Sequence, residues 1–292
     1  MHNATEARPA AAPSRSLLFG LRVRLQSIVG PCAARDCQDV DREWYRVPRR
    51  VRRVKVQDRW YCASRCLERA AADAVVALKA SSRLGPTGGY RMPLGLLMVS
   101  QGELNFEQLR RALNAQNNAS HRRLGEWLQD LGFTTEERIT AALSVQWACP
   151  TLRITPDAQI SCARLLPRTL QQAYCMLPVH FTPQSRTLYV GFGDRIAHRM
   201  LYAVDQMLTC RTIPCLVTRQ ALSDAMQRVD GNAAWSEAAF ERGSDAYETG
   251  HIIAGYAQRC SAHEVRVTSC GEFIWARLFS RRTQFDLLFR TA

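Results

Sequence analysis

The feature that most constrains the fold is a repeat, because residues 93–116 match residues 123–146 when the chain is compared with itself at an offset of 30. Both copies have the form x-L-G-x-x-[LM]-x-x-x-G, followed after six residues by [LI]-x-x-x-L-x-x-Q. The matched pairs include Leu94 and Leu124, Gly95 and Gly125, Met98 and Leu128, Gly102 and Gly132, Leu109 and Ile139, and Gln116 and Gln146. A unit this short cannot bury its apolar face alone, so the two copies are expected to pack on each other.

Each copy predicts two helices joined by a turn. Gly102 and Gly132 follow the first helices and can adopt the left-handed conformation that ends a helix. The second helix of copy one is expected to begin at Asn105, whose side chain can cap free backbone N–H groups. Thr134 or Thr135 is expected to do the same in copy two. Each copy is therefore predicted to be a helix-turn-helix.

The apolar residues of both copies recur at helical spacing and predict one buried face for each helix. The residues expected on these faces are Leu94, Leu97, Met98, Phe106, Leu109 and Leu113 in the first copy, and Trp127, Leu128, Leu131 and Phe133 in the second.

Packing leaves some of the repeated residues unexplained. Gly95 and Gly125 lie near helix starts, where glycine is unfavourable unless something approaches the backbone closely. Gln116 and Gln146 recur at the ends of the second helices, and Arg123 directly precedes the second copy's leucine-glycine. Arginine binds the O6 and N7 atoms of guanine, and a glycine turn at a helix start can receive a phosphate. The pattern favours a twofold ligand that carries guanines and phosphates.

The paired pattern R-L-G-x-x-L-x-x-x-G-x-x-x-x-x-x-L-x-x-x-L-x-x-Q resembles the tandem motif of the MshEN domain. That domain stands at the N-terminus of type II secretion and type IV pilus assembly ATPases and binds cyclic di-GMP. The resemblance implies a cyclic di-GMP site. Its expected contacts are Leu94, Gly95, Met98, Gly102, Gln116, Arg123, Leu124, Gly125, Leu128, Gly132 and Gln146.

The two copies match the family pattern unequally. The second copy departs from it only at Ile139, which replaces a leucine. In the first copy, Pro93 replaces the arginine and Met98 a leucine. Arg91 lies two residues before Pro93 and could substitute for the missing arginine. The first half of the ligand site is therefore in doubt at this stage.

The resemblance continues to about residue 229 and implies a fold of the α+β class. We expect a helical tandem helix-turn-helix repeat followed by a small α/β subdomain, with a zinc-finger-like module at the N-terminus. The expected regions are a disordered segment or short amphipathic helix at 1–30, a four-cysteine module with a trailing helix at 31–80, a linker at 81–90, the nucleotide-binding repeat at 91–148, the α/β subdomain at 149–229 and a C-terminal α/β appendage at 230–292.

The cysteines fall into two groups. Cys32, Cys37, Cys62 and Cys66 lie close together in the chain and provide the four thiolates that close a tetrahedral zinc site. Residues 60–66 resemble the second knuckle of small zinc fingers, in which the last cysteine opens a helix. Four-residue spacing within the first pair departs from that pattern, so free thiols stay an alternative. The seven other cysteines are expected to be small buried apolar residues.

The formal net charge of +13 comes almost entirely from arginine and favours an anionic partner. Residues 46–55 alternate basic residues with valines and predict a strand with a basic face. Nucleic-acid contact through this segment is one interpretation, and a solvated basic strand is another. No run approaches the roughly 20 apolar residues of a membrane-spanning helix, and we expect a cytoplasmic protein.

No catalytic motif is present in the sequence. The segment 85–89 resembles the opening of a phosphate-binding loop, but the Gly-Lys-Ser/Thr that would hold phosphates and magnesium is missing, so no ATPase core of that type is expected. The histidines are dispersed, at His2, His121, His180, His198, His251 and His263. We therefore expect a protein that is not an enzyme.

Three functions remain open from the sequence. The first is a cyclic di-GMP sensor that acts through contacts with a protein of a secretion or pilus machine. The second is an assembly module of such a machine that needs no nucleotide, which Pro93 favours. The third is a zinc-dependent regulator that binds nucleic acid through the basic N-terminal region.

Overall fold

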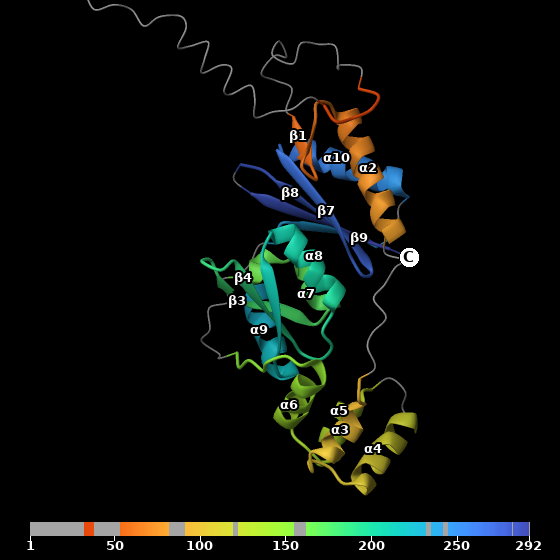
Figure 1. The fold of residues 1–292 in the computed structure, drawn as a ribbon, viewed down its shortest axis with the longest axis vertical. Helices are drawn as coiled ribbons and strands as arrows, with labels where there is room; N and C mark the ends of the chain where they lie inside the picture. The colour runs from red at the N-terminus through yellow and green to blue at the C-terminus, as the bar shows by residue number, and fades with distance from the viewer. Residues whose placement is uncertain are drawn as a thin grey trace, which may run out of the picture.

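The computed structural model describes residues 32–37, 53–81, 91–118, 122–154, 162–231, 235–241, 245–281 and 283–291. Three parts follow one another along the long axis of Figure 1. A larger sheet covered by two helices lies at one end, a smaller α/β part lies in the middle, and the helical repeat lies at the other end. The predicted α+β class is confirmed. Within the described residues, no helix combines the length and apolar character that crossing a membrane requires.

The repeat forms four helices, which are α3 (Leu94–Ser100), α4 (Phe106–Asn118), α5 (Leu124–Asp130) and α6 (Glu136–Trp147). The two copies exchange partners. Helix α3 of the first copy packs mainly on α6 of the second, and α5 of the second packs mainly on α4 of the first. Met98 and Leu128, the matched residues of the two copies, are fully buried in the shared core. The copies therefore form one folded unit, as the repeat predicts.

Glycine ends the first helix of each copy in the predicted way. Gly102 has φ of +75° and Gly132 has φ of +69°. The Glu103 amide donates to the Met98 carbonyl at 2.9 Å, and the Phe133 amide donates to the Leu128 carbonyl at 2.9 Å. These paired bonds define a Schellman motif, which requires the left-handed conformation that glycine adopts without strain.

The helix starts confirm one predicted cap and correct the other. The Asn105 side chain accepts a hydrogen bond from the Gln108 amide at 2.8 Å, and the Gln108 side chain accepts one from the Asn105 amide at 2.9 Å. Thr135 occupies the cap position of α6, but its side chain makes no capping bond. The pKa of Glu137 is lowered by a hydrogen bond from its own backbone amide and, to a smaller extent, by the Thr135 side chain.

The predicted buried face of α4 is too wide. Phe106 is 72% exposed and Leu113 is 40% exposed, and Leu131 beyond α5 is also 40% exposed. Helix α4 lies at the edge of the molecule and is covered on one side only (Figure 1). Its buried face is therefore reduced to Leu109 and Ala112.

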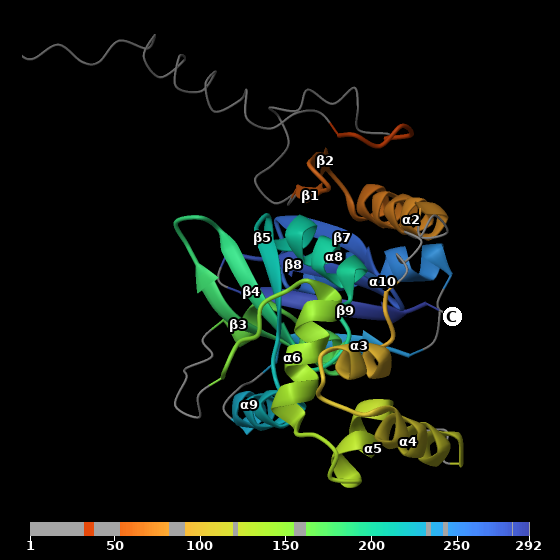
Figure 2. The same cartoon turned by 60° about the horizontal axis from the view of Figure 1, so that its bottom comes forward.

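The middle part contains a sheet with strand order β3-β4-β5. Its strands are β3 (Met176–Thr182), β4 (Thr187–Phe192) and β5 (Arg211–Leu216), and its helices are η1 (Ala163–Leu165), α7 (Arg168–Ala173), α8 (His198–Leu208) and α9 (Arg219–Gly231). Strands β3 and β4 are antiparallel, whereas β4 and β5 are parallel. Figure 2 shows α6 extending from the repeat toward this sheet, where Thr151 pairs with Leu216.

The larger sheet joins the two ends of the chain, with strand order β2-β1-β7-β8-β9-β6. Its strands are β1 (Val54–Val56), β2 (Arg59–Tyr61), β6 (Glu237–Phe240), β7 (Glu264–Cys270), β8 (Phe273–Phe279) and β9 (Gln284–Arg290). Strand β1 pairs with β7 in parallel, so regions 31–80 and 230–292, which the sequence analysis separates, contribute to one sheet. The predicted region boundaries themselves stay a prediction.

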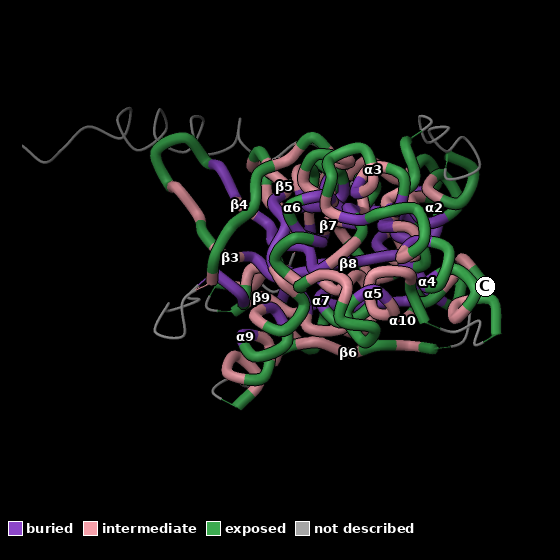
Figure 3. Tube along the Cα trace, turned by 90° about the horizontal axis from the view of Figure 1, so that it is seen from below, coloured by how far each residue is buried: buried purple, intermediate pink, exposed green. Residues whose placement is uncertain are grey.

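Helices α2 (Ser64–Ser81) and α10 (Ala246–Arg259) pack tightly on each other over the larger sheet. A Cβ atom at Gly250 would lie 2.7 Å from the Glu68 carbonyl oxygen, so only glycine permits this approach. The opposite face of the sheet packs on the middle part, and β7 and β8 are largely buried (Figure 3). Arg277 and Asp286 form a buried ion pair on that face, with Nε to Oδ1 at 2.7 Å.

Candidate ligand-binding site and cysteine cluster

Arg123, Leu124 and Gly125, the first three residues, or head, of the second motif copy, line a hollow of about 130 Å³ where the repeat meets the middle part. Leu94 of the first copy lies on the same hollow. Opposite them, the middle part contributes Gly193, Asp194 and Arg219. The hollow therefore combines residues of both copies with residues outside the repeat.

The parallel pairing of β4 and β5 brings Asp194 and Arg219 together. Phe192, the last residue of β4, pairs with Leu216, the last residue of β5. Asp194 follows β4 by two residues, and Arg219 begins α9 three residues after β5. Carboxyl ends of parallel strands meet at one edge of a sheet, where ligands of α/β folds often bind.

Ion pairs connect the two sides of the hollow. The Arg123 guanidinium contacts the Asp194 carboxylate, and Arg219 contacts Glu126 in α5. A second Arg219 nitrogen lies 3.5 Å from Asp194. Burial raises the pKa of Glu126, but hydrogen bonds from Arg219 and Arg122 outweigh this effect and leave the pKa lowered. Glu126 is therefore charged near neutral pH and compensates the charge of Arg219.

A further carboxylate crosses the same interface. Glu136 at the start of α6 accepts hydrogen bonds from the backbone amides of Arg219 at 2.5 Å and of Gln220 at 3.2 Å. These amides belong to the first turn of α9, whose free N–H groups favour an anionic partner. The repeat thus supplies the anion for this helix start.

The recurring glutamines have a structural role that the sequence analysis did not find. The Gln116 side-chain amide donates to the carbonyl of Arg122 at 3.1 Å, and that of Gln146 donates to the carbonyl of Met92 at 2.6 Å. Each acceptor lies two residues before a motif leucine, and each glutamine holds the chain entering the other copy's first helix. The bonds are related by the 30-residue offset and explain the repetition without a ligand.

The two motif glycines have different surroundings. A Cβ atom at Gly95 would lie 2.5 Å from Leu109 Cδ1 and 3.1 Å from Leu124 Cδ2. A Cβ atom at Gly125 would lie 3.4 Å or more from Ile139, which is ordinary contact. Packing therefore requires glycine at position 95 more strongly than at position 125. Gly125 lines the hollow and is open to close approach by a ligand.

The first copy has no arginine equivalent to Arg123 at its head. Pro93 occupies the cap position of α3, and the Arg91 guanidinium lies over the Trp147 ring at 3.8 Å from its centroid. Trp147 in turn stacks on His198 of α8, with ring centroids 5.8 Å apart. Arg91 is therefore engaged in a stack on α6, away from the residues of the hollow.

The structure brings together only part of the predicted contact set. Leu94, Arg123, Leu124 and Gly125 line the hollow. The other predicted residues lie outside the lining of the hollow and belong to the core, the helix ends or the contacts between the two copies. They are Gly95, Met98, Gly102, Gln116, Leu128, Gly132 and Gln146. Asp194 and Arg219 were not predicted, because the pairing of β4 with β5 brings them to the hollow and no local motif marks them.

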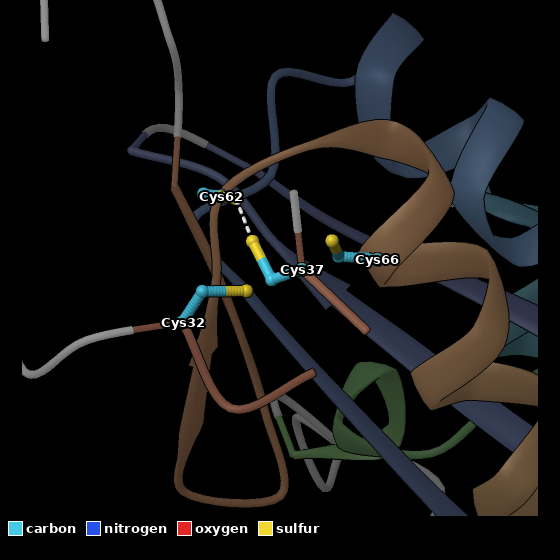
Figure 4. Close-up of side chains that lie close together, drawn as sticks. All are labelled: Cys32, Cys37, Cys62 and Cys66. Atoms are coloured by element: carbon cyan, nitrogen blue, oxygen red, sulfur yellow. Dashed lines mark hydrogen bonds between the residues drawn. The ribbon is translucent and has the colours of Figure 1, made fainter. Parts of the chain in front are cut away.

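The predicted metal ligands lie together at the other end of the molecule. The Sγ atoms of Cys32, Cys37, Cys62 and Cys66 all lie within 4.8 Å of one another. Figure 4 shows the four side chains facing one another, with Cys37 Sγ and Cys62 Sγ 3.4 Å apart. Cys66 lies in the first turn of α2, as the zinc-finger resemblance implies.

Two of these thiols, Cys62 and Cys66, resist ionisation, whereas at Cys32 hydrogen bonds outweigh the effect of burial and lower the pKa. Burial and the neighbouring Cys32 and Cys37 thiols raise the pKa of Cys66 to about 11. Burial and the hydrogen bonds that the Cys62 thiol shares with Cys37 and Cys32 also raise the pKa of Cys62. A bound cation would reverse this effect, because it stabilises neighbouring thiolates.

The remaining cysteines are buried or half-buried free thiols, as expected of small apolar residues. Burial raises the pKa of Cys162 to about 11 and that of Cys215 and Cys270 to about 12. These thiols are therefore poor nucleophiles. Of the basic segment at 46–55, only residues 53–55 lie within the described part, so the predicted basic strand falls largely outside it.

Comparison with known proteins gives similarity to solved structures. A structure of MshE with cdg (cyclic di-GMP) is 28% identical, covers 47% of this chain and 99% of that chain, and has a TM-score of 0.41. The N-terminal domain of XpsE is 16% identical, with coverage of 46% of this chain and 92% of that chain and a TM-score of 0.34. No protein-family model and no curated protein matches the chain.

Proposed function

We propose that this chain is a non-catalytic receptor for cyclic di-GMP that acts through contacts with a protein of a secretion or pilus machine. The observation that carries the proposal is the position of Arg123, Leu124 and Gly125. The intact head of the second motif copy lines a hollow that also contains Arg219. The MshEN-type sequence pattern of residues 93–146 supports the choice of ligand.

The chemistry of the hollow fits one part of such a ligand. Two arginines offer planar guanidinium groups that bind phosphate oxygens or the O6 and N7 atoms of guanine. Gly125 leaves room for close approach, and Leu94 and Leu124 offer apolar contact to a base. The volume of about 130 Å³ lies below the roughly 300 Å³ at which ligand pockets begin. Most of the ligand would therefore lie across the surface of the repeat.

Titration calorimetry with cyclic di-GMP tests the proposal. We expect binding by the full chain and its loss in Arg123→Ala. Arg110→Ala is the matched control, because Arg110 is an exposed arginine of the same repeat that pairs with Glu107 within α4. It should leave the affinity unchanged. No binding heat at ligand concentrations up to about 100 µM would exclude an affinity tight enough for regulation and would contradict the receptor hypothesis.

A nucleotide-independent assembly module is the second candidate. Two observations favour it, since Pro93 removes the first arginine and Asp194 already neutralises the second. On this reading, the ion pairs across the hollow only hold the repeat on the middle part. The same calorimetry separates the two, because an assembly module would bind its partner protein equally well with and without cyclic di-GMP.

We propose in addition that Cys32, Cys37, Cys62 and Cys66 hold a structural zinc ion. Tetrahedral zinc with Zn–S bonds of about 2.3 Å places its sulfur ligands roughly 3.8 Å apart. The observed cluster fits this arrangement. Zinc would attach residues 32–37 to β2 and to the start of α2.

Elemental analysis of the purified chain tests the zinc site. We expect one zinc per chain, lost in Cys37→Ser together with a lower melting temperature. Cys260→Ser is the control, because Cys260 is a free cysteine at the end of α10 and outside the cluster. A metal-free chain whose melting temperature does not respond to zinc or to a chelator would argue for free thiols.

Nucleic-acid binding through the basic N-terminal segment stays a prediction. Deleting residues 1–80 would remove β1, β2 and α2 and so damage the larger sheet. A better test replaces Arg49, Arg50 and Arg52 with glutamine, which leaves the residues of β1, β2 and α2 unchanged. DNA binding that survives this change would contradict the regulator hypothesis.

A further inference from the structure

We propose that Arg219 is a second anion-binding residue of the cyclic di-GMP site, and that Asp194 occupies this site until the ligand replaces it. The inference rests on the proposed function, because it concerns the same hollow. It adds a residue outside the motif and a way for binding to change the contact between the repeat and the middle part. The charges around the hollow support both parts of this proposal.

Each arginine of the hollow already has a carboxylate partner. Arg123 contacts Asp194, and Arg219 contacts both Glu126 and Asp194. An incoming phosphate would be repelled by these acids unless one of them leaves. Asp194 is the shared partner of both arginines, so its departure would free binding capacity on both at once.

Asp194 is placed so that it can leave. It lies beyond the end of β4, between that strand and α8, and its side chain is 18% exposed. Glu136 is bound differently, because it accepts two backbone hydrogen bonds from α9. Exchange at Asp194 would therefore break side-chain pairs only, whereas exchange at Glu136 would uncover a helix start.

Replacement of Asp194 would change how the repeat is attached. The Arg123–Asp194 pair crosses from the start of α5 to the middle part, and Arg219–Glu126 crosses back to α5. Helix α6 is held separately, because Leu143 and Trp147 pack against the core of the middle part. Ligand binding would thus replace the direct bridge from Asp194 to α5 by a bridge through the ligand, while α6 stays in place, and the differential affinity for the two arrangements would limit the shift.

Calorimetry on three variants of the full chain tests the exchange, with cyclic di-GMP and inorganic pyrophosphate as ligands. Asp194→Asn removes the competing charge and keeps the shape, so we expect binding to be about three- to tenfold tighter than in the parent chain. Arg219→Gln should weaken binding about tenfold. Asp130→Asn is the control, because Asp130 pairs with Arg122 outside the hollow, at 2.6 Å. It should bind like the parent chain.

The outcomes separate this inference from the proposed function. Equal or weaker cyclic di-GMP binding by Asp194→Asn would overturn the exchange while leaving the receptor function intact. If no variant binds cyclic di-GMP, the receptor function is contradicted, and pyrophosphate binding then tests the exchange at Asp194. Tighter pyrophosphate binding by Asp194→Asn supports the exchange, and unchanged binding overturns it.

Hydrogen exchange gives a readout that affinity does not. In Asp194→Asn the α5 amides should exchange faster than in the parent chain without ligand, because the direct bridge is lost, whereas α6 amides should change little. Added ligand should slow α5 exchange again in this variant, because it then bridges Arg123 and Arg219. Faster α5 exchange in Asp194→Asn that ligand does not reverse would overturn the exchange of Asp194 for ligand.

Discussion

The two copies of the repeat share a framework and differ at their heads. In each copy the first helix packs mainly on the second helix of the other copy, and a glycine in the left-handed conformation ends that first helix. Gln116 and Gln146 make equivalent hydrogen bonds to the opposite copy. The first residues of the two copies differ in charge. Arg123 meets an acid of the middle part, whereas Pro93 has no charge to offer and the nearby Arg91 stacks on Trp147.

This difference teaches that the repetition and the site have separate origins. Residues that recur in both copies mainly hold the copies together. Asp194 and Arg219 reach the hollow from outside the repeat, because the second copy's head faces the edge of the sheet where β4 and β5 end, whereas the first copy contributes Leu94 alone to the lining. A twofold motif here lines a one-sided hollow.

Truncation of the matched core residues should give the largest effect. Met98 and Leu128 are both fully buried in one core, so Met98→Ala and Leu128→Ala should each lower the free energy of unfolding by about 2–5 kcal/mol. Chemical denaturation measures both. If the copies folded independently, each variant would show two separate transitions, and the shared framework would be refuted.

Alanine should have different effects on stability at the two motif glycines, although they occupy matched positions of the repeat. Gly95→Ala forces a methyl group against the buried Leu109 and should destabilise the chain by about 1–2 kcal/mol. Gly125→Ala meets only ordinary contacts and should be neutral or stabilising by up to about 1 kcal/mol, since alanine suits a helix better. Thermal melts of the ligand-free variants check this. Equal destabilisation would show that the two positions are packed alike.

Much of the framework could be predicted from the sequence, because its causes are local. Apolar spacing, the positions of Gly102 and Gly132 and the Asn105 cap indicate helices and their ends directly. The close approach of four cysteines was also predictable from their type and spacing. Side-chain burial at the edge of the fold was not, since the exposure of Phe106 depends on which neighbours cover α4.

The site was only half predictable for a similar reason. Arg123 and Gly125 belong to a local pattern, whereas Asp194 and Arg219 reach the hollow through the pairing of β4 with β5. The pairing of β1 with β7 joins residues more than 200 positions apart, and nothing local indicates it. Short strands such as β1 carry little sequence signal, so tertiary contact decides their partner.

The smallest expected effect concerns the recurring glutamines, which make equivalent bonds in the two copies and so test what the copies share. Each donates one bond to a backbone carbonyl of the other copy, so Gln116→Ala and Gln146→Ala should each lower the free energy of unfolding by about 0.5–1.5 kcal/mol without ligand. Similar losses in denaturant titrations would identify both as parts of the framework. Should both variants unfold like the parent chain and only ligand affinity fall, the glutamines would belong to the site, and the twofold pattern would again reflect a twofold ligand.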